Sequence, residues 1–181
     1  DTNEDNRVFV KWNPEIVAAT ENAQYTAEFA EDLNNNGKAD KDETKFTITY
    51  LNKDGSEFAK FENQLEGLAT PQPKNNPTAE GFVFDGWKDV AATISKDERY
   101  ESKWLVDSDK DGIADEKEVK VEFYVDNKVE KTEYLMPGEK PTAPKVEDTD
   151  KDNRVFTGWT PEITEVKEED KTVKYEATFE E

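Results

Sequence analysis

Cysteine and histidine are both absent from the chain. Without cysteine, the protein can form neither a disulfide nor a thiolate metal site. Without histidine, it lacks the usual general base, the Ser-His and Cys-His nucleophile pairs and the imidazole zinc sites. Enzymes that use paired carboxylates need no histidine, but no pair stands out among the 44 acidic residues. We therefore expect a protein that is not an enzyme.

Apolar residues are also scarce. Phe, Leu, Ile and Val make up 35 of the 181 residues, which, with the high net charge, lies at the compositional border of disorder. Four Trp and six Tyr favour a folded protein, because each aromatic side chain buries a large area. We expect small modules with thin, aromatic-rich cores.

No apolar run approaches the length of a membrane span, so we expect no membrane insertion. The sequence starts at Asp1 and shows no signal peptide, so we expect a piece of a longer protein. Its 24 basic and 44 acidic residues give a net charge of −20. Nucleic acid and anionic membrane surfaces are poor partners for that charge, whereas divalent cations are good ones.

Two acidic twelve-residue stretches, 32–43 and 107–118, are offset by 75 residues. Both place oxygen-bearing side chains at positions 1, 3, 5 and 9, glycine at position 6 and glutamate at position 12. This is the spacing of the EF-hand calcium loop. Alternate positions of a tight coil point inward, position 7 offers its carbonyl, and the glutamate closes the shell with both oxygens.

The spacing predicts two Ca²⁺ sites, and the predicted ligands fall into two sets. The first set is Asp32, Asn34, Asn36, the Lys38 carbonyl, Asp40 and Glu43, and the second is Asp107, Asp109, Asp111, the Ile113 carbonyl, Asp115 and Glu118. The alternative is a pair of solvated acidic linkers that bind nothing tightly. Such linkers have no need of Gly37, Gly112 and both terminal glutamates.

The rest of the chain is built from an aromatic repeat. Phe precedes Trp by three residues in each of three copies, and a Tyr-x-x-x-aromatic block follows each Trp. The pairs are Phe9/Trp12, Phe84/Trp87 and Phe156/Trp159, and the blocks are Tyr25–Phe29, Tyr100–Trp104 and Tyr175–Phe179. These blocks alternate large apolar residues with polar or small ones, as half-buried strands do. We expect the three repeated Trp side chains to pack in module cores, although a glycan-stacking platform is an alternative.

Each complete unit also begins with a predicted hairpin, turning at Lys53–Ser56 and at Asp126–Asn127. A proline-marked crossover follows, and Gln64–Ala69 has room for one helical turn. The predicted organisation is a partial repeat at 1–31 with the second half only, a calcium linker at 32–44, a repeat at 45–106, a calcium linker at 107–118 and a repeat at 119–181.

Unit 119–181 resembles the Listeria–Bacteroides repeat, the internalin B-repeat type. The residues that carry this resemblance are Gly138–Pro144, Phe156-Thr-Gly-Trp159 and the Tyr175 block. The resemblance implies small β-grasp-like modules, strung in tandem in cell-wall-anchored surface proteins and adhesins of Gram-positive bacteria. The two loops resemble the calcium linkers of thrombospondin type 3 repeats and dockerins. The expected fold is therefore mainly β, with small α+β modules in an elongated array and calcium loops at the joints.

Two weaker candidates for cation binding begin like calcium loops but lack the closing glutamate. They are Asp148, Asp150 and Asp152, and Asp1, Asn3 and Asp5. We expect acidic turns there, with weak surface binding of a third cation as the alternative.

The leading hypothesis is a monomeric, non-enzymatic stalk segment of a secreted bacterial cell-surface protein, with Ca²⁺ fixing the joints between neighbouring repeats. An acidic linker without metal repels itself and bends freely. The second hypothesis is an adhesin whose repeats bind a host protein or glycan. The third is a carboxylate-based hydrolase, which would need a carboxylate pair in a cleft.

Overall fold

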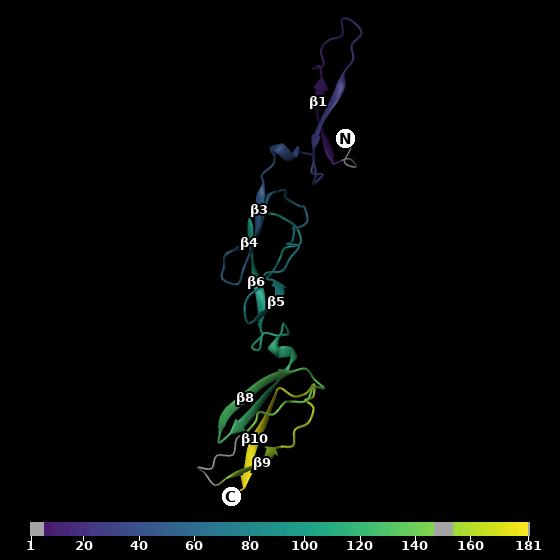
Figure 1. Ribbon diagram of the computed structural model, residues 1–181. Coiled ribbons are helices and arrows are strands. Elements are labelled where there is room, and N and C mark those ends of the chain that lie inside the picture. The colour runs from purple at the N-terminus through teal and green to yellow at the C-terminus, as the bar shows by residue number, and fades with distance from the viewer. Residues whose placement is uncertain (1–5, 147–153, 181) are drawn as a thin grey trace. The chain divides into compact units, whose positions relative to one another are not determined.

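The computed structural model describes residues 6–146 and 154–180, and this part is mainly β (Figure 1). It contains no α-helix, and none of its helices is long and apolar enough to cross a membrane. The two 3-10 turns η2 (Asp40–Asp42) and η3 (Asp115–Lys117) lie in the acidic loops. The strands are β1 (Arg7–Asn13), β2 (Thr26–Glu31), β3 (Phe46–Leu51), β4 (Glu57–Gln64), β5 (Phe82–Trp87), β6 (Glu98–Val106), β7 (Val119–Val125), β8 (Lys128–Leu135), β9 (Val155–Thr160) and β10 (Thr172–Glu180).

The strands form three small sheets. The first hairpin consists of β1 and β2, the middle sheet has the order β4-β3-β6-β5, and the C-terminal sheet has the order β8-β7-β10-β9. The chain divides into two compact units, Asp1–Pro77 with Gly86–Lys103, and Thr78–Asp85 with Trp104–Glu181. The predicted mainly-β class is confirmed. The β-grasp fold, the elongated array and the domain boundaries stay predictions.

In the C-terminal sheet, the alternation of β7 sends Val119, Val121 and Phe123 into the core, where none is more than 2% exposed. The turn into β8 is formed by Asp126 and Asn127, both with positive φ, as a tight hairpin requires. This turn confirms the predicted hairpin.

The centre of this sheet is a parallel pair. β10 runs parallel to β7, with Tyr175 opposite Phe123. Their rings are stacked with centroids 5.2 Å apart, and Trp159 of β9 meets the Phe123 ring edge-on at 4.9 Å. The predicted core position of Trp159 is thus confirmed.

The middle sheet repeats this arrangement. β3 runs parallel to β6, with Tyr50 opposite Tyr100 and ring centroids 5.3 Å apart. Trp87 packs against the fully buried Tyr50 at 4.7 Å, which confirms its core position. Gly55, with φ of 83°, completes the predicted turn between β3 and β4. The segment after β4 makes a hydrogen-bonded turn instead of a helical one.

The first hairpin has no such partner strands among the described residues. There, β1 and β2 pair only with each other, and Trp12 is 42% exposed. The expectation that Trp12 lies in a core is therefore wrong. Trp87 and Trp159 are covered because each contacts an aromatic residue of a parallel strand, and the first hairpin lacks that strand.

This difference predicts unequal effects of one substitution at two equivalent positions. Trp159→Ala should destabilise the C-terminal sheet by about 3 kcal/mol, since it removes a large side chain packed against a small core. Trp12→Ala is the matched control and should cost less than about 1 kcal/mol, because the indole is already 42% exposed. Urea unfolding followed by circular dichroism measures both, and equal losses would contradict the packing described here.

Candidate metal centres

The two acidic loops share one backbone conformation. Position 4 is left-handed in both, at Asn35 (φ 55°) and Lys110 (φ 66°), and so is the glycine at position 6, Gly37 (φ 86°) and Gly112 (φ 94°). A Cβ atom at either glycine would meet nothing within 4 Å. Glycine is therefore required there for its backbone angle and not for space. Each loop then closes through a 3-10 turn over positions 9–11.

Each loop is also fixed at its start in the same way. The backbone N–H of Asp32 donates to the Asn6 carbonyl at 2.8 Å, and that of Asp107 donates to the Gly81 carbonyl at 3.0 Å. The alanine at position 8 is buried in both, with Ala39 7% and Ala114 1% exposed. The loops are therefore built into the chain around them and are not free linkers.

In the second loop, three carboxylates converge. Single oxygens of Asp107, Asp109 and Asp111 all lie within 4.8 Å of one another, with Asp107 buried and the other two exposed. Three like charges so close together repel one another, and a cation between them replaces this repulsion with attraction. This cluster can hold a metal ion.

Two buried oxygens in this loop have no hydrogen-bond partner. Among the described residues, only three buried side-chain atoms are in this position, and two of them are Asp107 Oδ1 and Glu118 Oε2. The other Asp107 oxygen accepts from the Gly112 N–H at 3.1 Å. An unpaired carboxylate oxygen is costly to bury, so each of these atoms offers a position to a cation.

The electrostatics of Glu118 agree with this geometry. Burial raises the pKa of its carboxyl from 4.5 to about 7, and the charges of Asp111, Asp109, Asp115 and Asp107 add to the effect in that order. Burial, followed by Asp111, also raises the pKa of Asp109. The ionised form of the loop is thus unfavourable without a positive charge.

Asp115, the predicted ligand at position 9, accepts two hydrogen bonds from Ser108. Its Oδ1 accepts from the Ser108 N–H at 2.7 Å and its Oδ2 from the Ser108 hydroxyl at 2.6 Å. The structure therefore does not place it within the cluster of three aspartates. The ligand roles of Asp115 and of the Ile113 carbonyl stay predictions. The spacing rule gives no hint of Ser108, because position 2 of the loop has no assigned role.

In the first loop, three of the predicted ligands also lie close together, but there they form hydrogen bonds with one another. The amide nitrogen of Asn34 lies 3.3 Å from both carboxylate oxygens of Glu43, and that of Asn36 donates to Glu43 Oε1. Positions 3, 5 and 12 thus converge. The amides face Glu43 with their nitrogens, and rotation of each amide would present its oxygen to a cation.

Both aspartates predicted as ligands in the first loop already have backbone partners. Asp32 Oδ1 and Oδ2 accept from the N–H groups of Asn36 and Gly37 at 3.0 and 2.9 Å. Asp40 Oδ1 accepts from the Leu33 N–H at 2.9 Å. Lys38 donates its N–H to Asn36 Oδ1 at 2.9 Å, and its carbonyl as a ligand stays a prediction. The first loop is therefore satisfied internally, whereas the second is not.

Two weaker candidates for cation binding lie outside the described residues, namely Asp1, Asn3 and Asp5, and Asp148, Asp150 and Asp152.

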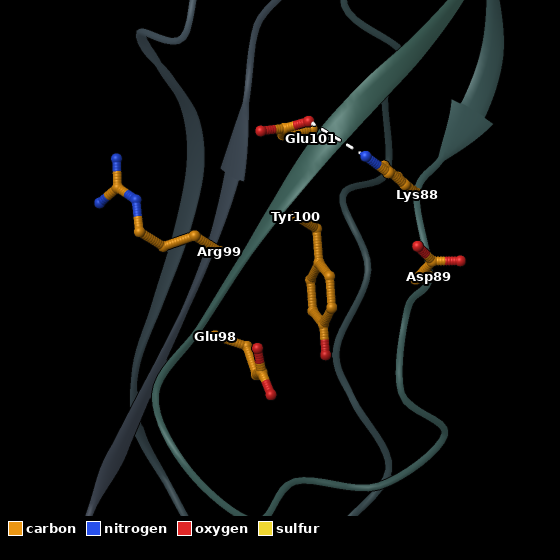
Figure 2. A pocket seen from close by; sticks show the side chains of 6 residues that line it. All are labelled: Lys88, Asp89, Glu98, Arg99, Tyr100 and Glu101. Atoms are coloured by element: carbon orange, nitrogen blue, oxygen red, sulfur yellow. Dashed lines mark ion pairs between the residues drawn. The ribbon is translucent and has the colours of Figure 1, made fainter.

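The middle sheet also has a surface hollow (Figure 2). Its two glutamates are each near a lysine, Glu101 at 3.8 Å from Lys88 and Glu98 at 3.4 Å from Lys96. The Tyr100 hydroxyl accepts a hydrogen bond from the Ala91 N–H. Glu98 and Glu101 are thus ion-pair partners on the surface.

A scan against protein-family models finds no match to this chain, and a comparison with curated proteins finds none either. The function of the loops is therefore inferred from their residues and geometry. The family resemblance of residues 119–181 stays an expectation.

The raised pKa of Glu118 predicts a pH dependence of the metal-free protein. Between about pH 4.5 and 7, the folded chain holds a proton on Glu118 that the unfolded chain has released. Stability should therefore fall as the pH rises through this window, and Glu118→Gln should flatten the fall because glutamine does not ionise. Urea unfolding of protein freed of divalent cations, at several pH values in the window, measures the slope. An unchanged slope in the variant would contradict the assignment.

Proposed function

We propose that this chain is a non-enzymatic, calcium-binding spacer segment of an extracellular bacterial surface protein, in which Ca²⁺ orders the two loops between β modules. The observation that carries the proposal is the pair of buried, unpartnered oxygens, Asp107 Oδ1 and Glu118 Oε2. They belong to positions 1 and 12 of one loop, the two ends of a calcium shell.

The donor chemistry favours calcium over other metals. Every predicted side-chain ligand in both loops offers a carboxylate or amide oxygen, and the chain has no histidine or cysteine to attract zinc or copper. The irregular coil with a closing glutamate suits the six to eight oxygens and flexible geometry of Ca²⁺. Mg²⁺ is a poorer candidate, because it demands a near-ideal octahedron and keeps several of its waters.

The position of the loops in the chain supports their role as joints. β2 ends at Glu31, directly before Asp32, and β6 ends at Val106, directly before Asp107. β7 begins at Val119, directly after Glu118. A cation that holds positions 1 and 12 together thereby ties the end of one strand to the beginning of the next. Binding to the ordered loop alone shifts the joint toward order.

The extracellular, cell-wall-attached location and the neighbouring repeats as partners follow from the resemblance of unit 119–181. Calcium loops of extracellular modules bind at about 10⁻⁴–10⁻³ M, and this range suits a structural ion. A second candidate function is an adhesin that binds a glycan or host protein. It is favoured by the exposed Trp12, which lines a surface hollow with Lys11, Asn13, Glu15 and Ile16.

Calcium titration by calorimetry should fit two sites. The second loop should bind more tightly, because its predicted ligands carry five formal negative charges and those of the first loop carry three. Glu118→Gln should remove the tighter site and Glu43→Gln the weaker one. Glu130→Gln, an exposed carboxylate on β8, is the charge-matched control and should remove neither. A stoichiometry near zero, or equal losses from the control, would exclude specific sites.

Limited proteolysis tests the joint. With Ca²⁺, both loops should resist cleavage, and chelation should expose 32–43 and 107–118 before any strand is cut, since the sheets do not contain the metal. Glu118→Gln should sensitise only the second loop. Cleavage rates at both loops that are identical with Ca²⁺ and with chelator would defeat the joint hypothesis, even if calorimetry had detected binding.

A further inference from the structure

In the first hairpin, β2 begins after the stretch that pairs with a parallel strand in the two complete sheets. Tyr25, Tyr100 and Tyr175 are spaced 75 residues apart. β6 and β10 begin before their tyrosine, at Glu98 and Thr172, whereas β2 begins after Tyr25, at Thr26. Residues 22–25 therefore belong to no strand, although residues 98–100 of β6 and 172–175 of β10, at the corresponding positions, do.

In both complete sheets, the corresponding residues pair with a parallel strand. Residues 98–101 of β6 pair in parallel with Ile48–Leu51, and residues 172–176 of β10 pair in parallel with Lys120–Tyr124. The stretch around the tyrosine is thus the edge that receives the first strand of a β-hairpin. In the first hairpin this stretch has the same sequence position but no strand beside it within the described residues.

The apolar face beside this edge already has the arrangement that it has in a complete sheet. Phe9 lies 5.6 Å from Trp12 and 5.9 Å from Phe29 between ring centroids. In the C-terminal sheet, Phe156 lies 5.6 Å from Trp159 and 6.0 Å from Phe179.

An arginine lies over the last ring in both sheets. Arg7 lies over Phe29 at 5.5 Å, and Arg154 over Phe179 at 4.5 Å. The first hairpin therefore keeps the aromatic geometry of a complete sheet without the strand that covers it there.

The exposure of this face shows what is missing. Trp12 and Phe29 are 42% and 38% exposed. In the C-terminal sheet, Trp159 is half-buried because Phe123 of β7 packs against it. Likewise Tyr175 is 2% exposed beneath β7, whereas Tyr25 is only half-buried.

We propose that the first hairpin, together with residues 22–25, is a docking face for a β-hairpin supplied by another repeat of the same type. The first strand of that hairpin adds in parallel beside residues 22–26 and places an aromatic side chain against Trp12 and Tyr25. Strand addition supplies backbone hydrogen bonds, and the aromatic contact supplies selectivity.

The two hairpins that pair in parallel with β6 and β10 show which kind of hairpin would dock here. β3–β4 and β7–β8 each offer a central aromatic residue, Tyr50 or Phe123, on the strand that pairs in parallel. Both are already committed to β6 and β10, so a second copy of this chain has none to donate without opening its own sheet. A glycan would need the Trp12 face alone and would not order residues 22–25.

A graft tests the proposal with calcium present throughout, so that the outcome does not depend on the loops. Residues 119–152 are joined to Asn6 of a chain comprising residues 6–181, because Asn153 is the counterpart of Asn6. The added hairpin should extend β2 back to residue 22 and cover Trp12. Amide exchange at residues 22–25 should slow by at least about tenfold, and quenching of the Trp12 indole N–H resonance by a soluble paramagnetic probe should fall to the level of Trp159.

The matched control is the same graft carrying Phe123→Ser in the added copy only, which should restore fast exchange and quenching. A second measurement uses a synthetic peptide of residues 119–146 added to the ungrafted protein. It should bind the wild-type chain and not Trp12→Ser. Unchanged exchange and quenching in the graft, or peptide binding that ignores Trp12→Ser, would overturn the proposal. Protection of Trp12 by an oligosaccharide without protection of residues 22–25 would replace it with the glycan function.

Discussion

The parallel contact between two central strands is the interaction on which each complete sheet depends. A hairpin alone is marginally stable, because two strands bury little apolar surface. Stacking Tyr175 on Phe123, or Tyr100 beside Tyr50, joins two hairpins through aromatic rings at about 5 Å. This contact also helps to cover the repeated Trp, since Tyr50 packs against Trp87 and Phe123 packs against Trp159.

The two acidic loops show how one backbone can carry two electrostatic states. Positive φ at positions 4 and 6 and the 3-10 turn are common to both. What differs is the side chain at positions 3 and 5. Asn34 and Asn36 can donate to Glu43, so the first loop satisfies its closing carboxylate internally. Asp109 and Asp111 cannot donate when ionised, so Glu118 keeps an unpaired oxygen and a raised pKa.

Local chemistry was predictable from the sequence, and non-local burial was not. The turn at Asp126–Asn127 follows from residues that tolerate positive φ, and the convergence of the loop positions follows from their spacing. The prediction for Trp12 failed because Trp12 shares the Phe-x-x-Trp and Tyr-x-x-x-aromatic spacing of Trp159, while burial of the indole depends on a strand far away in sequence. Ser108 was missed because its hydrogen bonds to Asp115 arise only once the loop has closed.

The loops and the sheets are coupled through the first loop residue. Asp32 and Asp107 each donate their N–H to the residue that precedes a strand, Asn6 before β1 and Gly81 before β5. β5 belongs to a four-stranded sheet, whereas β1 has only β2 as a partner in the part of the chain that the structure describes. The anchor of Asp32 is therefore held by a hairpin that is itself marginal, and the ordering of the first loop costs more. Its lower ligand charge and its weaker anchor both lower the affinity that we expect the first loop to have for Ca²⁺. A strand added beside residues 22–26 would strengthen the anchor without touching a ligand, because it stabilises the hairpin that holds Asn6.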